Sequence, residues 1–375
     1  MNVTVTGAGG IGGAIETTVD IAIVGAGPAG LYAAYCAGFR GLSAAVVDGL
    51  DEPGGQVSAM YPEKLLYDVA GHPGITGRGL IDNLLRQAEP FRTAHLLGRT
   101  AVSLDPREAG AAHGNGGGQG PAAGPGWTLG TDDGSRVHAG AVVIAAGLGR
   151  FVPRTLPCSV PYEGRGVAYQ VPRLDAHAGR DVVVVGGGDS AVDWALALAP
   201  LARSVTLVHR RGTFRAHEHS VRLVYASGVR VLTDAQVVAC HGADRLERVE
   251  VRAAEDTLIL PAQSLVAALG FSSGPGPVAD WGLELEHRRI RVDRSMRTNL
   301  PRVYAVGDGC TYPGRVPLIS VGFGEAGTAV NHAAVSLRPG ERLAPEHSSD
   351  TSPGDTAPAA PAVRPAPAAA AAVPA

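Results

Sequence analysis

The stretch DIAIVGAGPAG, from Asp20 to Gly30, decides the fold of this 375-residue chain. An apolar run (IAIV) leads into Gly25, Gly27 and Gly30, and an alanine-rich run (LYAAYCAGFRG) follows. This order predicts a strand, a tight glycine loop and a helix, as in a Rossmann-type unit. The first glycine permits the turn, the second lets the backbone approach a pyrophosphate, and the third lets helix and strand pack closely.

An acidic residue ends the next predicted strand. The strand reads SAAVVD, and its last residue, Asp48, stands 23 residues after Gly25. A carboxylate at about this spacing accepts hydrogen bonds from ribose hydroxyls, while the pyrophosphate lies at the helix N-terminus. The first unit is therefore expected to bind a dinucleotide whose ribose 2′-hydroxyl is free.

A second strand–glycine–helix unit, DVVVVGGGDSAVDWALALAP, begins at Asp181 and carries Gly186, Gly188 and Ala191. The residue 23 positions after Gly186 is not acidic, and a basic cluster begins there: His209, Arg210, Arg211 and Arg215. An acid would repel a 2′-phosphate, whereas arginines hold one with charge-assisted hydrogen bonds. This contrast predicts FAD in the first unit and NADPH in the second. Two such sites in one chain favour hydride transfer between nicotinamide and flavin.

Composition narrows the class of protein. Net charge is −3, apolar residues make up 45% and charged residues 18%, so a soluble globular protein without general attraction to nucleic acid or membranes is expected. No apolar stretch is long enough to span a bilayer, which leaves the cytoplasm as the expected location. The cysteines, Cys36, Cys158, Cys240 and Cys310, show no CxxC spacing, so neither a redox dithiol nor a zinc site is predicted. His217 and His219 lack further ligands nearby, and no metal site is expected.

Three segments lie outside the regular pattern. Gly7, Gly9 and Gly12 imitate the fingerprint but have no helix after them, so residues 1–18 are expected to form a flexible extension. Residues 108–126 are rich in glycine and alanine and are expected to form a long loop between two strands of a small antiparallel unit. Residues 349–375 are rich in alanine and proline and are expected to be disordered.

Longer motifs carry a family resemblance: GGQVSAMYPEKLLYDVAGHP (54–73), GGGDSAVDWAL (186–196), HRRGTFRAHEHS (209–220), AVGDGCTYPG (305–314) and GFGEAGTAVN (322–331). On these motifs the chain resembles the thioredoxin-reductase-like flavoproteins, from about Val19 to Ser349. It is most similar to the ferredoxin/flavodoxin–NADP⁺ reductases of this class-II pyridine nucleotide-disulfide oxidoreductase superfamily. Thioredoxin reductases carry CxxC before the second glycine loop, where this chain reads VAYQVPRLDAHAGRD. Cys158 lies too early and is expected to have no partner, so electrons would leave the flavin directly.

The resemblance implies an α/β fold of two Rossmann-like three-layer dinucleotide-binding domains. The FAD-binding domain would span residues 19–157 and 282–348, with the NADPH-binding domain, 158–281, inserted in it. It also implies a homodimer that passes electrons between NADPH and ferredoxin or flavodoxin, with no side-chain acid or base. Two alternatives stay open: an NADPH-dependent reductase of a low-molecular-weight disulfide or a quinone, which a cysteine such as Cys310 near the flavin would favour, and a non-catalytic NADPH- or redox-sensing flavoprotein.

The resemblance also implies roles for individual residues. Tyr61 and His347 would stack on the flavin. The residues implied for FAD are Gly25, Gly27, Pro28, Ala29, Gly30, Asp48, Gly55, Gln56, Tyr61, Ala101, Phe151, Asp308, Glu325, Ala326 and Ser349. Those implied for NADPH are Gly186, Gly188, Asp189, Ser190, His209, Arg210, Arg211 and Arg215.

Overall fold

The computed structural model describes residues 13–108, 125–149, 152–254, 256–272, 274–344, 347, 349–350 and 352–366. The chain divides into two compact units, which are described separately. Unit 1 comprises Met1–Ser58, Lys64–Arg150 and Gly274–Ala375, and unit 2 comprises Ala59–Glu63 and Phe151–Ser273. Each unit contains a parallel sheet with helices, which confirms the predicted α/β class. The main breaks fall after residues 150 and 273, a few residues before the boundaries expected at 157 and 281.

Unit 1 is built on an eight-stranded sheet in the order β5-β2-β1-β8-β7-β6, with β21 also on β8 and β23 also on β1. Its strands are β1 (Ile15–Val24), β2 (Ala44–Asp48), β5 (Ala94–Leu97), β6 (Ala101–Arg107), β7 (Gly126–Thr131), β8 (Arg136–Ile144), β21 (Val303–Ala305) and β23 (Val363–Pro365). The strands β5, β2, β1, β8 and β21 run parallel. Parallel strands are covered on both faces, which explains why β1 and β8 each end in an apolar run, IAIV at 21–24 and AVVI at 141–144.

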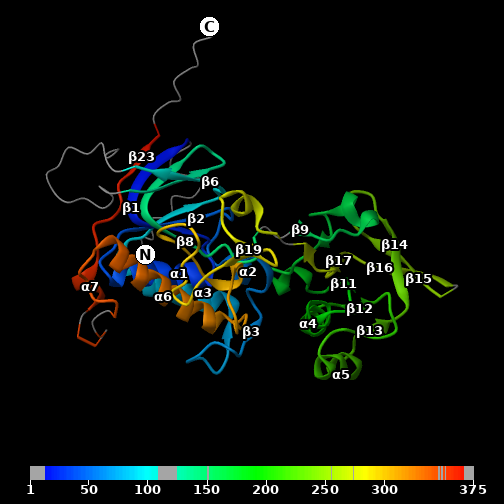
Figure 1. Ribbon diagram of the computed structural model, residues 1–375. Coiled ribbons are helices and arrows are strands. Elements are labelled where there is room, and N and C mark those ends of the chain that lie inside the picture. The colour runs from blue at the N-terminus through cyan, green and yellow to red at the C-terminus, as the bar shows by residue number, and fades with distance from the viewer. Residues whose placement is uncertain are drawn as a thin grey trace, which may run out of the picture. The chain divides into compact units, whose positions relative to one another are not determined.

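Helices and short strands complete unit 1: α1 (Pro28–Phe39), α2 (Gly55–Met60), α3 (Gly77–Ala88), α6 (Ile319–Leu337), α7 (Pro353–Thr356), η1 (Glu89–Phe91), η4 (Gly276–Asp280), η5 (Gly307–Gly309), β3 (Leu65–Leu66), β4 (Ile75–Thr76), β19 (Leu285–Glu286), β20 (Arg289–Arg291) and β22 (Cys310–Thr311). The helices α1 and α6 lie side by side (Figure 1). Small buried residues, such as Ala33 in α1 and Ala329 in α6, permit this close packing. The strands β6 and β7 pair antiparallel, as predicted, and residues 109–124 between them lie outside the described residues.

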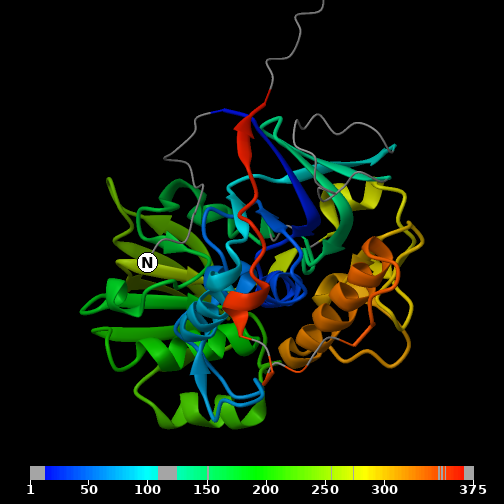
Figure 2. The same cartoon turned by 90° about the vertical axis from the view of Figure 1, so that its left-hand side faces the viewer.

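The two ends of the described chain differ from the sequence prediction. β1 begins at Ile15, four residues before the expected strand start at Val19. Part of the tail expected to be disordered forms β23, which pairs antiparallel with β1 from Ile15↔Pro365 to Thr17↔Val363 (Figure 2). The physical reason is an open edge: β2 pairs with β1 only at Ile21–Val24, so backbone groups nearer the start of β1 need another partner.

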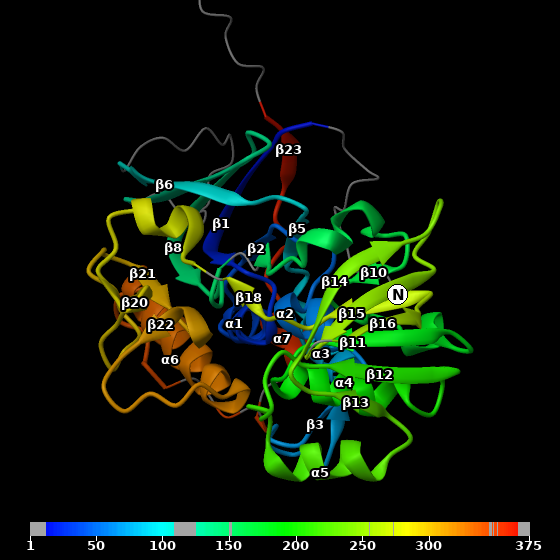
Figure 3. The same ribbon diagram turned by 90° about the vertical axis from the view of Figure 1, so that its right-hand side faces the viewer.

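Unit 2 contains a parallel sheet in the order β10-β17-β11-β12-β13 and an antiparallel sheet in the order β14-β15-β16 (Figure 3). Its elements are β9 (Val152–Pro153), η2 (Pro157–Tyr162), β10 (Val167–Ala168), η3 (Leu174–His177), β11 (Asp181–Val185), α4 (Asp189–Leu198), β12 (Ser204–Val208), α5 (Glu218–Ala226), β13 (Arg230–Leu232), β14 (Ala235–His241), β15 (Arg248–Ala253), β16 (Asp256–Pro261), β17 (Ser264–Ala267) and β18 (Phe271–Ser272). Alternate residues of β11 face opposite sides. Val183 and Val185 pack toward β14 and β15, whereas Val182 and Val184 pack toward α4.

Candidate functional site: two glycine loops

The first glycine loop joins β1 to α1 and leaves room for a ligand at one point only. A Cβ on Gly25, where φ is +107°, would lie 2.4 Å from the Ala145 carbonyl oxygen, and one on Gly30 would lie 1.9 Å from the Gly25 carbonyl oxygen. A Cβ on Gly27 would meet nothing within 4 Å. Gly25 and Gly30 are therefore required by packing, while Gly27, the N-cap of α1, borders open space where backbone amides can meet a pyrophosphate.

Asp48 ties the end of β2 to this loop. Its Oδ2 accepts a hydrogen bond from the Ala26 amide at 2.6 Å, and its Oδ1 accepts one from the Leu50 amide at 2.8 Å. Burial raises the pKa of Asp48, and these two hydrogen bonds oppose that rise. Each carboxylate oxygen retains a second lone pair, so Asp48 can hold the loop and accept from a ribose hydroxyl at the same time.

Other residues expected at the FAD site gather around the start of α1. A Cβ on Gly55 would lie 3.1 Å from the Gly27 Cα, and one on Gly307 would lie 3.4 Å from the Ala29 Cβ. The Gln56 Nε2 lies 3.1 Å from the Cβ position of Gly147, which follows β8. The starts of α1 and α2 and the segments after β8 and β21 therefore meet at one place in unit 1.

The remaining residues of the FAD set take different positions. Pro28 opens α1, Ala101 is buried at the start of β6, and Ala326 is buried in α6. Tyr61 is half-buried and belongs to the short stretch that groups with unit 2. His347 and Ser349 are exposed, and Phe151 lies outside the described residues. Flavin contacts by Tyr61, Phe151, His347 and Ser349 therefore stay predictions.

Glu325 does not face open space but forms the centre of a buried network. Its Oε2 accepts from the Gly307 amide at 2.7 Å, and its Oε1 accepts from Tyr312 Oη at 3.0 Å and Arg315 Nε at 2.9 Å. Arg315 also contacts Asp308, with 3.3 Å between Nη2 and Oδ1. Asp308, 43% exposed, is thus the carboxylate that remains accessible, and Glu325 supports it through Arg315. The sequence prediction missed Tyr312 and Arg315, whose only signal was that one lies within the motif around Asp308 and the other directly after it.

Cys310 belongs to the same network and is fully buried. Its Sγ lies 3.7 Å from the Glu325 Oε2. Burial, and then the charge of Glu325, raise the pKa of Cys310 to about 12. Because the thiolate is the nucleophilic form of cysteine and this thiol is closed off from solvent, Cys310 is a poor nucleophile toward disulfides at neutral pH.

The second glycine loop, between β11 and α4, repeats the geometry of the first. A Cβ on Gly186 would lie 2.4 Å from the Ala268 carbonyl oxygen, whereas one on Gly188 would meet nothing within 4 Å. Gly188 is the N-cap of α4. Asp189 accepts from the His217 amide through Oδ1 at 2.8 Å, and Ser190 is exposed. The open side of this loop lies at the helix N-terminus, as in the first unit.

The structure corrects the role expected of His209. Its ring is buried, lies against Gly187 and stacks on Phe214 with 5.0 Å between ring centroids. Its Nε2 is 3.0 Å from the Thr213 carbonyl oxygen. Since the ring is enclosed by its own turn, His209 shapes the turn instead of facing a phosphate.

The three arginines of this turn are placed differently from His209. Arg210, Arg211 and Arg215 are exposed, and their guanidinium groups form no hydrogen bond or ion pair with any described residue. The Arg215 amide donates to the Gly187 carbonyl at 2.8 Å, which ties the basic turn to the glycine loop. The cationic groups are therefore held next to the second loop and are available to an anion.

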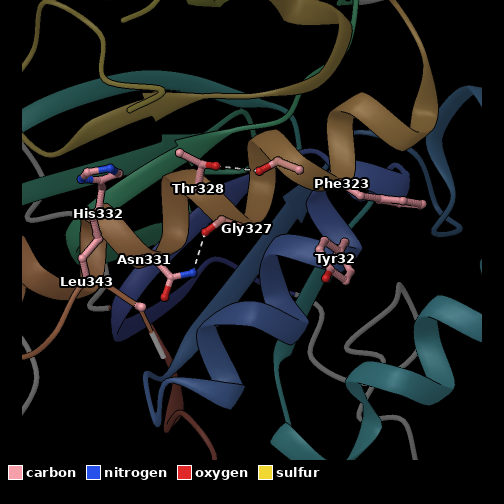
Figure 4. A pocket seen from close by; sticks show the side chains of 9 residues that line it. Tyr32, Phe323, Gly327, Thr328, Asn331, His332 and Leu343 are labelled. Atoms are coloured by element: carbon pink, nitrogen blue, oxygen red, sulfur yellow. Dashed lines mark hydrogen bonds between the residues drawn. The ribbon is translucent and has the colours of Figure 1, made fainter. Parts of the chain in front are cut away.

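A separate groove of about 450 Å³ lies between α1 and α6, with Tyr32, Phe323 and Leu343 in its wall (Figure 4). Two of its polar side chains are satisfied within α6, since Asn331 Nδ2 donates to the Gly327 carbonyl at 2.8 Å and Thr328 Oγ1 donates to the Gly324 carbonyl at 2.9 Å. The groove offers few groups to a charged nucleotide. Within the described ranges, no cluster of His, Cys, Asp or Glu could hold a metal ion, and no helix could cross a bilayer.

Comparison with known proteins identifies the family. The profile of the pyridine nucleotide-disulphide oxidoreductases matches residues 19–333, most of the chain. The chain belongs to this family. Its chemistry is FAD-dependent oxidation and reduction with a pyridine nucleotide, and both glycine loops fit such ligands through the open space at Gly27 and Gly188.

Relatives within the family agree with one another. The chain is 55% identical over 336 residues to the ferredoxin–NADP reductase of Saccharopolyspora erythraea, covering 88% of this chain and 97% of the relative. It is 43% identical to the Thermus thermophilus protein of the same name, over 88% of this chain and 96% of that protein. Among solved structures, thioredoxin reductase from T. acidophilum matches with a TM-score of 0.66 and 24% identity, covering 86% of this chain and 98% of that one. This last likeness concerns the fold alone.

Proposed function

We propose that this chain is a ferredoxin–NADP⁺ reductase that uses FAD and NADPH. The observation that carries the proposal is the contrast between two otherwise equal loops. Both have open space at the second glycine, but Asp48 follows the first, and the free arginines Arg210, Arg211 and Arg215 stand beside the second. The names of the relatives that are 40–55% identical support the same reaction.

FAD, when bound, supplies the step between two-electron hydride transfer with NADPH and one-electron transfer with a carrier protein. The chain's own residues bind and orient. The amides at the start of α1 and α4 would hold the two pyrophosphates, and Asp48 would accept from the ribose of the first nucleotide. The arginines would neutralise the 2′-phosphate of the second, and Asp308, held by Arg315, presents a carboxylate beside the first loop.

The carrier partner is ferredoxin or flavodoxin, and a basic segment of unit 1 is suited to receive an acidic protein. Four exposed arginines lie within ten residues of the chain around β20: Arg288, Arg291, Arg294 and Arg297. Arg291 lies 3.8 Å from Glu284, whereas Arg294 and Arg297 form no ion pair with a described residue. β20 pairs in parallel with β22, where Ile290 is opposite Cys310, two residues after Asp308. These arginines thus lie one strand away from the loop that carries Asp308. Attraction between them and an acidic carrier protein would speed the association of the two proteins.

The structure disfavours the alternative of a disulfide reductase that uses Cys310. That thiol is fully buried, and its pKa is raised to about 12, so it does not supply a nucleophile at the flavin. A homodimer, expected from the family resemblance, and a cytoplasmic location, expected from the sequence composition, form part of the proposal. Light scattering coupled to size exclusion tests the dimer.

One assay tests the proposed reaction. Purified holoprotein is mixed with NADPH and cytochrome c, with and without ferredoxin, and in parallel with low-molecular-weight disulfides and quinones. We expect cytochrome c reduction to depend on ferredoxin. Equal rates without ferredoxin, or faster turnover of a disulfide or quinone, would contradict the proposal.

A further inference from the structure

Two cysteines that are far apart in the sequence meet in unit 2. Cys158 lies in η2 and Cys240 lies in β14, and their Sγ atoms are 3.9 Å apart although 82 positions separate them. Both side chains are only partly buried. This corrects the expectation that Cys158 has no partner. We propose that Cys158 and Cys240 are a redox-modification site, which a low-molecular-weight disulfide converts into an intramolecular disulfide.

The pair is held together by contacts on both sides of it. The Cys158 Sγ lies 4.0 Å from the Val237 carbonyl oxygen in β14. At the other end of η2, Tyr162 Oη donates to the Gly242 carbonyl oxygen at 3.0 Å, just after β14 ends. Because η2 contacts β14 on both sides of Cys240, the two thiols are kept close by the fold and not by chance side-chain conformations.

An irregularity in β14 accompanies this arrangement. The pairing of β14 with β15 shifts register between Val237 and Ala239, directly before Cys240. Such a bulge changes the direction in which the following side chains point. A disulfide needs about 2.05 Å between the sulfurs, so the two thiols must approach one another from 3.9 Å.

The surroundings of the two sulfurs set the order of events. Burial raises the pKa of Cys158, and the hydrogen bond that the Cys240 S–H donates to the Cys158 sulfur opposes that rise. Burial, and then the neighbouring Cys158, raise the pKa of Cys240 to about 12. Cys158 therefore attacks first and releases one thiolate from the small disulfide, leaving a mixed disulfide. Cys240 then loses its proton, attacks the Cys158 sulfur and releases the second thiolate. In sum, two protein thiols are oxidised, and one small disulfide is reduced to two thiols.

The bond would change the stability of unit 2 and not its chemistry. It would close a loop of 82 positions between η2 and β14, and long loops yield the larger entropic stabilisation in chain-entropy models. Neither sulfur belongs to the glycine loops or the basic turn. Because burial raises the pKa of both thiols, oxidation is slow at neutral pH and accelerates as pH rises.

The test uses the full-length holoprotein, reduced and then incubated with oxidised glutathione at a pH of about 9, where thiolate is more abundant. After removal of the reagent, we expect two of the four thiols to be lost when they are counted in denaturant. The intact mass should fall by that of two hydrogen atoms, and one cross-linked peptide should join Cys158 to Cys240. The melting temperature of unit 2 should rise by several degrees, and dithiothreitol should reverse all changes.

Single substitutions supply the controls. Cys158→Ser and Cys240→Ser should each abolish the cross-link, while Cys36→Ser, which alters a partly buried cysteine of unit 1, should retain it. Three results would overturn the proposal: four free thiols after prolonged incubation, stable glutathione adducts in place of the cross-link, or a cross-link through Cys36 or Cys310. Because thiol counts and mass are read on the wild-type protein first, misfolding of a variant leaves the test intact.

Discussion

Arg315 donates from Nε to the Glu325 Oε1 at 2.9 Å, and the two side chains are only 4% and 2% exposed. An ion pair so thoroughly removed from water contributes most visibly when one partner is lost, because the other charge stays buried. Since Arg315 also contacts Asp308, it connects the buried Glu325 of α6 to the exposed carboxylate of Asp308.

Glu325→Gln should therefore lower the free energy of unfolding by about 3–5 kcal/mol and weaken retention of FAD. Urea unfolding and release of flavin on dilution measure the two effects. Thr328→Ala, on the same helix, removes only a hydrogen bond to the helix backbone and should change neither by much. A stable Glu325→Gln protein with normal flavin retention would show that the network does not support Asp308.

The glycines of each loop should separate folding from binding. Gly25→Ala places a Cβ 2.4 Å from a backbone oxygen and should prevent folding of unit 1, whereas Gly27→Ala meets no atom and should fold but lose FAD. Gly188→Ala should likewise fold and keep FAD, yet bind NADPH at least tenfold more weakly. Circular dichroism, flavin absorbance and NADPH titration measure these outcomes. Full flavin content in Gly27→Ala would mean that the open space is not the pyrophosphate site.

The basic turn should decide between NADPH and NADH. Replacing Arg210 and Arg211 with alanine should raise the Michaelis constant for NADPH by roughly ten- to hundredfold, since each charge-assisted hydrogen bond contributes about 1.5–3 kcal/mol. The constant for NADH should change little, because NADH has no 2′-phosphate. Arg222→Ala, which removes an exposed arginine paired with Glu218, is the matched control. Equal losses with both nucleotides would contradict the phosphate assignment.

Acid should destabilise unit 2 through His177. Burial, and then Arg180, lower the pKa of this histidine, whose Nδ1 is 2.8 Å from Ser264 Oγ. The unfolded chain binds the proton more readily, so stability is fully present above pH 6.5 and declines as pH falls below it toward the lowered folded value. His177→Gln should be less stable at pH 8 but lose less stability between pH 7 and 5. The urea concentration at the midpoint of unfolding, measured from pH 5 to 8, tests this prediction. If stability fell equally with pH in both proteins, His177 would not be the cause.

Carrier docking should respond to charge reversal around β20. Replacing Arg294 and Arg297 with glutamate should raise the Michaelis constant for ferredoxin severalfold and flatten its dependence on salt. NADPH-dependent reduction of ferricyanide, a small acceptor, should stay unchanged and serves as the internal control. If ferredoxin kinetics were unaltered, the carrier would have to bind at another surface.

Much of this architecture could be predicted because its determinants are local. The strand, glycines and helix of each loop are contiguous, and the difference between Asp48 and the arginine turn lies at a fixed spacing. His209 could not be predicted in this way, because the direction of its ring depends on how it packs between Gly187 and Phe214. The approach of Cys158 to Cys240 depends on how η2 packs on β14, and no spacing rule for cysteines reports such a contact.

The tail illustrates a different limit. Alanine and proline content predicts too little apolar surface to order the segment, yet β23 needs only the backbone groups of β1 as partners. Amino-acid composition reports on side chains, whereas an open sheet edge is completed by backbone hydrogen bonds, which almost any residue can form. The same limit applies to Glu325: the family motif assigns it to the FAD site, but the sequence does not reveal its buried partners, Arg315 and the Gly307 amide.

The pairing of Ile15 with Pro365 places two points 350 residues apart in adjacent strands. A short peptide linker could therefore join them, and new ends could be opened between β6 and β7. Such a circular permutant would keep every strand neighbour of unit 1. Protein engineers could then attach a carrier protein at the new ends without disturbing either nucleotide loop.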